Sequence, residues 1–242
     1  MPKVTFAGYI APSGFLKQAG RGPLSLPDPA LLGANVTYAI VDSRFVADCE
    51  VQNADHDSIT RLHTWVYHLV RENLDIVSFV HGVGLTLIVE NCTLPNGEML
   101  PIHSIDRTVA PLCTMSMPDI LKVCEGDRRI LKHIHDLAYT LSHPLEIAVN
   151  CGRAIEGIAQ MMSSETDPQK RWSVLRENLN LTRDYVQLVS DVSKDPRHGG
   201  TQPQSLPQLY EVRNRAWTIA NRFLHFSKNG HVRLPLHGFP LL

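Results

Sequence analysis

The sequence predicts an α+β protein in which a small amino-terminal domain, a mixed β-sheet with one helix, precedes an all-α bundle of four to six helices. Before about residue 115, apolar and polar side chains alternate, which is the period of half-buried strands. After it, apolar side chains recur at three- and four-residue intervals, and Ser, Asp and Pro mark successive helix starts. We therefore expect a domain boundary between 1–114 and 115–242.

The amino-terminal half contains a predicted hairpin, in which the strands VTYAIV and RFVADCEV flank the two-residue connection Asp42–Ser43. Residues 58–71 carry apolar side chains at helical spacing and predict the single helix. We interpret three apolar segments after this helix as strands, with a turn at Asn96–Gly97 before the last of them: DIVSFV, GLTLIVENCTL and EMLPIHSI.

The carboxy-terminal half contains repeated helix-start signals. Ser116 to Asp119 supplies a cap, a proline and an acid in the order that opens a helix, and comparable signals stand at Pro144, Asp167–Pro168 and Ser205. In the helix after Pro144, Arg153 and Glu156 have two interpretations. They form an ion pair three residues apart, or they face a ligand.

The last long helix combines arginines with aromatic side chains. Arg213, Arg215 and Arg222 lie near Trp217 and Phe223 in a chain with no overall positive charge. Arginine beside an aromatic plane can hold phosphate and stack a base, so we treat Arg213, Arg215, Trp217 and Arg222 as candidate ligand-binding residues. Structural ion pairs within a bundle explain the same pattern.

Two arginine–histidine pairs are candidates for acid–base chemistry. In RRILKHIH, Arg129 and His133 share a helical face, where histidine can move a proton and arginine can steady a phosphate. The alternative is an exposed basic face. The second pair, Arg197 and His198, lies between a proline and two glycines.

The surroundings of this second pair suggest different roles for its two members. We expect Arg197 to anchor its loop to a helix carboxylate, that of Glu156 or Glu211, and His198 to remain at the surface.

Four segments resemble the carboxy-terminal signature of a widespread, functionally uncharacterised group of bacterial proteins: CGRAIEGI, RWSVLRENLNL, YVQLVSDVSKDPRHG and EVRNRAWTIANRFLHF. The resemblance covers residues 145–240 and is similar in style to HEPN-type domains, helical bundles that often act as metal-independent ribonucleases or nucleotide-binding modules. It implies a HEPN-like bundle with a connection to RNA. The HEPN nuclease pattern, an arginine followed by four to six residues and a histidine, occurs here only outside 145–240.

Composition and motifs exclude several classes of function. With 23 basic and 24 acidic residues, no long-range field attracts a polyanion or an anionic membrane. The sequence lacks GxSxG, GxxxxGK[ST] and HExxH motifs, and its five cysteines form no CxxC pair, so we expect no cofactor and no metal. No apolar run approaches a membrane span, and we expect a cytoplasmic protein.

Two hypotheses of function remain. The first is a non-catalytic bundle that binds RNA, a nucleotide or a protein partner, with homodimerisation through apolar helix faces. The second is a metal-independent ribonuclease that uses Arg129 and His133, or Arg197 and His198.

Overall fold

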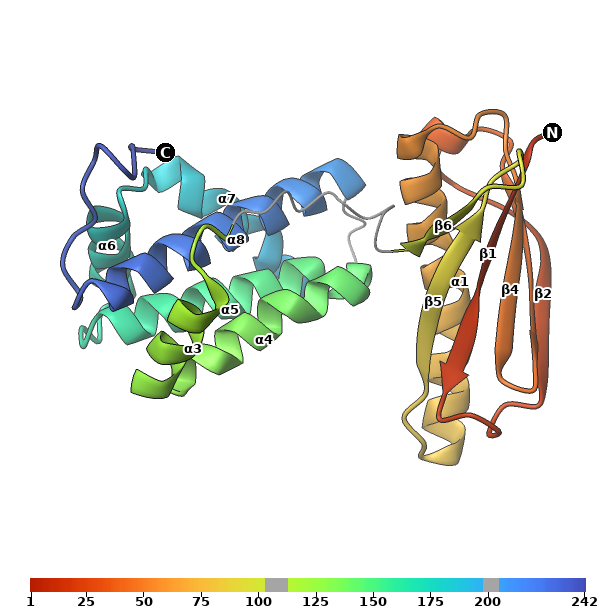
Figure 1. Ribbon diagram of the computed structural model, residues 1–242, viewed down its shortest axis with the longest axis horizontal. Helices are drawn as coiled ribbons and strands as arrows, with labels where there is room; N and C mark the ends of the chain where they lie inside the picture. The colour runs from red at the N-terminus through yellow and green to blue at the C-terminus, as the bar shows by residue number, and fades with distance from the viewer. Residues whose placement is uncertain (103–112, 198–204) are drawn as a thin grey trace. The chain divides into compact units, whose positions relative to one another are not determined.

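A computed structural model describes residues 1–102, 113–197 and 205–242 and divides the chain into two compact units, Met1–Arg107 and Thr108–Leu242 (Figure 1). The first unit is a β-sheet with one long helix, and the second is helical. The predicted α+β class is therefore confirmed.

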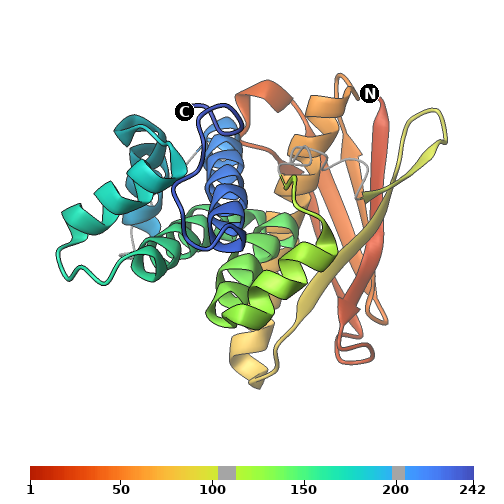
Figure 2. The ribbon, with the colours of Figure 1, turned by 60° about the vertical axis from the view of Figure 1, so that its left-hand side comes forward.

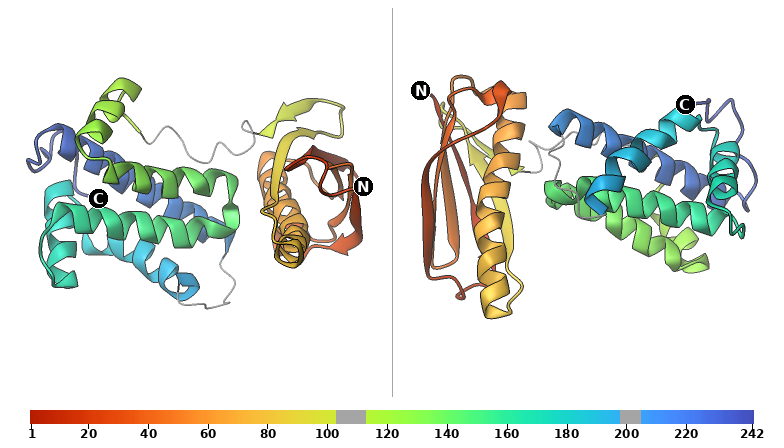
Figure 3. Two further views of the ribbon diagram at one scale, coloured as in Figure 1. Left: turned by 90° about the horizontal axis from the view of Figure 1, so that it is seen from below. Right: turned by 180° about the vertical axis from the view of Figure 1, so that it is seen from behind.

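The first unit is a six-stranded sheet with the strand order β2-β3-β4-β1-β5-β6. Every pairing is antiparallel, although we expected a mixed sheet. One sheet face packs against helix α1, as the left view of Figure 3 shows, and the alternating buried residues of β1 and β3 supply much of that core. The strands are β1 (Lys3–Ala11), β2 (Gln18–Ser25), β3 (Asn35–Val41), β4 (Arg44–Glu50), β5 (Thr86–Thr93) and β6 (Met99–Pro101), and α1 is His56–His81.

The predicted hairpin and turn are confirmed. Asp42 and Ser43 connect β3 to β4 with φ angles of 47° and 64°, the conformation that a tight two-residue hairpin needs. Gly97, at φ 85°, forms the turn between β5 and β6. Part of the segment EMLPIHSI, from residue 103 onward, lies outside the described residues.

The prediction of a strand at DIVSFV was wrong, because α1 continues through this segment to His81. Asp55 caps the helix by accepting a hydrogen bond from the Ser58 N–H at 2.8 Å. No proline or glycine intervenes before Gly82, which ends the helix in the left-handed conformation at φ 65°. The apolar side chains Ile76, Phe79 and Val80 are consequently exposed on the last turns of α1.

The described residues of the second unit form six α-helices, in agreement with the predicted bundle (Figure 2). Helix α5 is central and contacts α4, α6, α7 and α8. Ser116 and Asp167 cap α3 and α6 as predicted, whereas Ser205 stands at the start of α8 without a side-chain cap hydrogen bond. The helices are α3 (Met117–Gly126), α4 (Arg129–Ser142), α5 (Ile147–Met162), α6 (Pro168–Leu179), α7 (Arg183–Arg197) and α8 (Leu206–Lys228).

Candidate functional site

A groove between α4 and α5 brings together four of the predicted site residues, Arg129, His133, Arg153 and Glu156. Its volume is about 610 Å³. The other lining residues are Lys132, Asp136, Gly157, Gln160 and Met161. The groove therefore presents cations, carboxylates and one imidazole to the same space.

His133 lies on the floor of this α4–α5 groove, with only 8% of its surface exposed. The ring occupies the space that a side chain at Gly157 would fill, since a Cβ there would stand 1.9 Å from His133 Cε1. Burial lowers the pKa of His133, and the nearby Asp136 carboxylate opposes this effect only in part. The imidazole is therefore neutral at pH 7, with its Nδ1 buried and without a hydrogen-bond partner among the described residues.

The charged side chains of the groove pair between helices. Arg153 Nη2 lies 3.6 Å from Asp136 Oδ1, so the first of the two interpretations, an ion pair between Arg153 and Glu156, was wrong. Glu156 instead binds Arg197, which confirms the predicted pairing of Arg197 with a helix carboxylate. The predicted loop position of Arg197 was wrong, because α7 continues through Pro196 and ends at Arg197. These ion pairs form because neighbouring helices bring the groups together, a relation that spacing along α5 could not give.

The two predicted arginine–histidine pairs have different outcomes. Arg129 and His133 do line one groove, but the Arg129 guanidinium is bound by Asp127, with Nη2 2.6 Å from Oδ2. The partner of Arg197, His198, lies outside the described residues.

The arginines of α8 are engaged within the bundle. Arg222 donates hydrogen bonds to the carbonyl oxygens of Leu179, Asn180 and Pro240 at 2.7, 2.8 and 2.8 Å. Arg215 binds Glu211 and the carbonyl oxygens of Asp184 and Tyr185. These contacts fit the structural alternative.

The other two α8 candidates are also covered. Arg213 is 1% exposed, with its guanidinium 4.9 Å from the centre of the Tyr210 ring. Trp217 packs against the core of the bundle.

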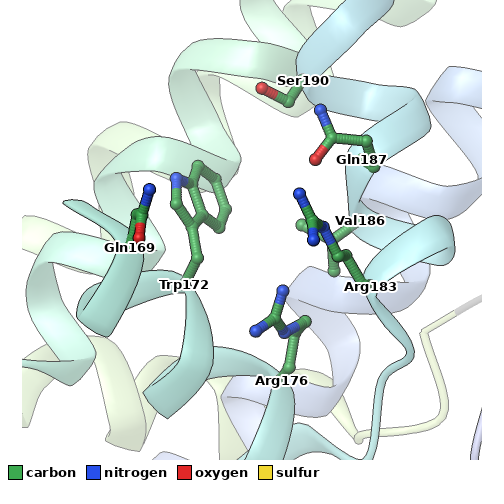
Figure 4. Close-up of a pocket in the computed structure, with 7 residues that line it drawn as sticks. All are labelled: Gln169, Trp172, Arg176, Arg183, Val186, Gln187 and Ser190. Carbon is green, nitrogen blue, oxygen red and sulfur yellow. The ribbon is translucent and has the colours of Figure 1, made fainter.

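A second hollow, the α6–α7 pocket, was missed by the sequence analysis (Figure 4). Its volume is about 260 Å³, and no carboxylate among the described residues lines it. Its lining residues are Gln169, Trp172, Arg176, Arg183, Val186, Gln187 and Ser190. Two guanidinium groups therefore face the same space as an indole ring.

The turn between α6 and α7 builds this pocket. Asn180 ends α6 in the left-handed conformation at φ 52°, which lets the chain reverse and start α7 at Arg183. Trp172 and Arg176 are four residues apart on α6 and so lie on one face. Figure 4 shows the indole and the two guanidinium groups on different sides of one space.

The two pocket arginines retain free hydrogen-bond donors. Arg176 donates from Nη2 to Ser173 Oγ at 3.2 Å, and neither Arg176 nor Arg183 has an ion-pair partner in the described part of the chain. A guanidinium carries five N–H donors, so most remain available to a ligand. The signal in the sequence was Trp172-x-x-x-Arg176, a spacing that places an aromatic ring and a cation on one helical face.

An antiparallel sheet with one helix, joined to a helical bundle that carries polar hollows, defines a two-domain α+β protein. The chain belongs to a two-domain family of unknown function. Residues 4–102 match the model described as Domain of unknown function (DUF8168) N-terminal domain, and residues 117–228 match Domain of unknown function (DUF8168) C-terminal domain. Neither description mentions HEPN domains. No curated protein and no solved structure matches the chain.

The described residues contain neither a membrane-spanning helix nor a cluster of metal ligands. None of the helices found there has both the length and the apolar character to cross a membrane. The same residues contain no cluster of three or more His, Cys, Asp or Glu side chains able to hold a metal ion.

Proposed function

We propose that the helical unit is a binding module for a nucleotide, taken either free or as one unit of a single-stranded RNA. The α6–α7 pocket holds its base and phosphate. The observation that supports this proposal most directly is the convergence of Trp172 with Arg176 and Arg183, two arginines without an acidic partner among the described residues.

The pocket chemistry matches the two halves of a nucleotide. An indole face stacks on any base, and such stacking contributes about 1–3 kcal/mol per base. A guanidinium binds phosphate oxygens through two parallel hydrogen bonds. Because the chain carries a net charge of −1, this attraction is local to the pocket.

The pocket size restricts the ligand to one nucleotide. At about 260 Å³, it lies just below the range of about 300–1,000 Å³ that is usual for sites of small molecules and cofactors. A dinucleotide cofactor would exceed this volume, whereas one base with its phosphate is of comparable size.

The test is a titration of the purified chain with AMP, with a short single-stranded RNA and with inorganic phosphate, by calorimetry and tryptophan fluorescence. Trp172→Ala is expected to weaken AMP binding roughly tenfold. Arg176→Gln and Arg183→Gln should each weaken binding and reduce its salt dependence by about one counterion. The matched control is Arg171→Gln, because Arg171 adjoins Trp172 on α6 but does not line the pocket.

The outcomes separate the ligand sources. Tighter binding of RNA than of AMP, with the same sensitivity to Trp172→Ala, indicates a strand as the ligand, and equal affinity indicates a free nucleotide. Absence of binding by both ligands, or equal weakening by Arg171→Gln and Arg183→Gln, contradicts the proposal.

A second candidate function, metal-independent cleavage of RNA, is favoured by one observation. The α4–α5 groove places the neutral imidazole of His133 in one space with Arg153 and Lys132. A neutral histidine can accept a proton from an attacking hydroxyl, and cations can stabilise charge on the phosphate.

RNA incubated with the protein in EDTA tests this candidate. Cleavage should be lost with His133→Ala and retained with His135→Ala, because His135 is exposed on the same helix and does not line the groove. Intact RNA with the folded wild-type protein, or equal cleavage by both variants, contradicts it.

A further inference from the structure

The α6–α7 pocket contains a hydrogen-bonding group whose direction is fixed. Gln187 lines the pocket, and its Nε2 donates to Asp191 Oδ1 at 2.6 Å, one turn further along α7. An ionised carboxylate accepts hydrogen bonds and donates none. The amide nitrogen of Gln187 must therefore face Asp191, because a reversed amide would set its oxygen against the carboxylate.

The consequence is an acceptor aimed into the pocket. In Figure 4 the Gln187 oxygen points toward the side occupied by Trp172, and its nitrogen points toward the side of Ser190. A base stacked on the Trp172 indole would bring its edge toward this oxygen. The oxygen can accept a hydrogen bond from an amino group, whereas a carbonyl group there would be repelled.

On this basis we infer that the pocket selects a nucleotide whose base carries an amino group, at position 6 of a purine or position 4 of a pyrimidine. Adenine and cytosine have this donor, whereas a base with a carbonyl group at the same position presents an acceptor. The inference rests on the proposed nucleotide site and adds the class of base to it.

Matched nucleotide pairs test the inference. AMP differs from IMP, and CMP from UMP, at the amino or carbonyl position in question and at the adjacent ring nitrogen, which carries a hydrogen only in IMP and UMP. We expect AMP to bind roughly three- to tenfold more tightly than IMP, the contribution of one neutral hydrogen bond. CMP should bind more tightly than UMP by a similar factor. The affinity of inorganic phosphate, measured in parallel, shows how strongly the site binds an anion alone.

Two variants isolate the direction of the amide. Asp191→Ala leaves the Gln187 amide free to turn. The ratio of AMP affinity to IMP affinity should then fall toward one, because IMP binds more tightly to this variant than to the wild type. Gln187→Ala should reduce the same ratio because AMP binds less tightly. In the control Gln169→Ala, the ratio of AMP affinity to IMP affinity should persist, since Gln169 lines the pocket but no carboxylate among the described residues accepts a hydrogen bond from its side-chain amide.

Failure of the proposed nucleotide site and failure of the proposed base preference give different results. If AMP, IMP, CMP, UMP and phosphate all fail to bind, the proposed site itself is refuted. If nucleotides bind with an AMP-to-IMP ratio near or below one, or if Asp191→Ala leaves a high ratio unchanged, the nucleotide site stands and the inference about the base is overturned.

Discussion

Replacement of Gly157 by alanine tests how tightly His133 packs against α5. A Cβ at position 157 would lie 1.9 Å from His133 Cε1 and 2.5 Å from Nδ1, far inside the contact distance of about 3.5–4.0 Å. The ring would have to leave its buried position, at an overpacking cost of about 1–3 kcal/mol. Alanine is favoured over glycine within a helix by about 0.5–1 kcal/mol, so we expect a net destabilisation of up to about 2.5 kcal/mol.

A double-mutant cycle separates the two effects. In a His133→Ala background the steric conflict disappears, so Gly157→Ala should stabilise the helical unit by about 0.5–1 kcal/mol. The coupling free energy should thus be about 1–3 kcal/mol. Urea unfolding of all four proteins by circular dichroism measures it.

Gly126→Ala, at a position where a new Cβ meets nothing within 4 Å, is the control and should show no coupling to His133. If Gly157→Ala has the same effect in both backgrounds, within about 0.5 kcal/mol, His133 does not pack on α5 as described. The proposed base for RNA cleavage would then lack a fixed position.

Three further predictions concern stability. Burial lowers the pKa of His68 to about 4, whereas the unfolded chain binds this proton below about pH 6.5. The free energy of unfolding should therefore be highest above pH 6.5 and fall by up to about 3 kcal/mol by pH 4. His68→Leu should remove most of this loss, as measured by urea unfolding midpoints at a series of pH values. Arg222→Met should cost about 3 kcal/mol or more in thermal unfolding, because three carbonyl oxygens lose a charged donor, and a loss below 1 kcal/mol would contradict the role assigned to Arg222. Glu156→Gln should cost no more than about 1 kcal/mol, since the carboxylate that binds Arg197 is 45% exposed, and its effect should shrink in high salt.

The features predicted correctly from sequence depend on local chemistry. The Asp42–Ser43 hairpin and the caps at Ser116 and Asp167 are set by a few neighbouring residues, and the structure has them where expected. DIVSFV failed because a short apolar run rich in β-branched residues fits a strand and a helix equally well. This segment is helical because no helix-terminating residue precedes Gly82.

The candidate sites were harder to predict because they depend on pairs of helices. Arg153 and Glu156 both have ionic partners, but on α4 and α7 and not on α5 itself. The α6–α7 pocket exists because Asn180 reverses the chain and brings Arg183 next to Trp172, two residues that are eleven positions apart. Periodicity places residues on faces of one helix and says nothing about which faces meet.

The different roles of the arginines follow from the acceptors within their reach. The last carbonyl groups of a helix have no partner within that helix. At the end of α6, Arg222 donates hydrogen bonds to the carbonyl oxygens of Leu179 and Asn180, so its buried guanidinium is engaged inside the bundle. Arg183 starts the next helix, where the free backbone groups are N–H donors that give an arginine no acceptor. Its charge, together with the N-terminal end of the helix dipole, therefore favours an anion from outside the chain. The position of an arginine relative to helix ends thus indicates a ligand better than the number of arginines on one helix face.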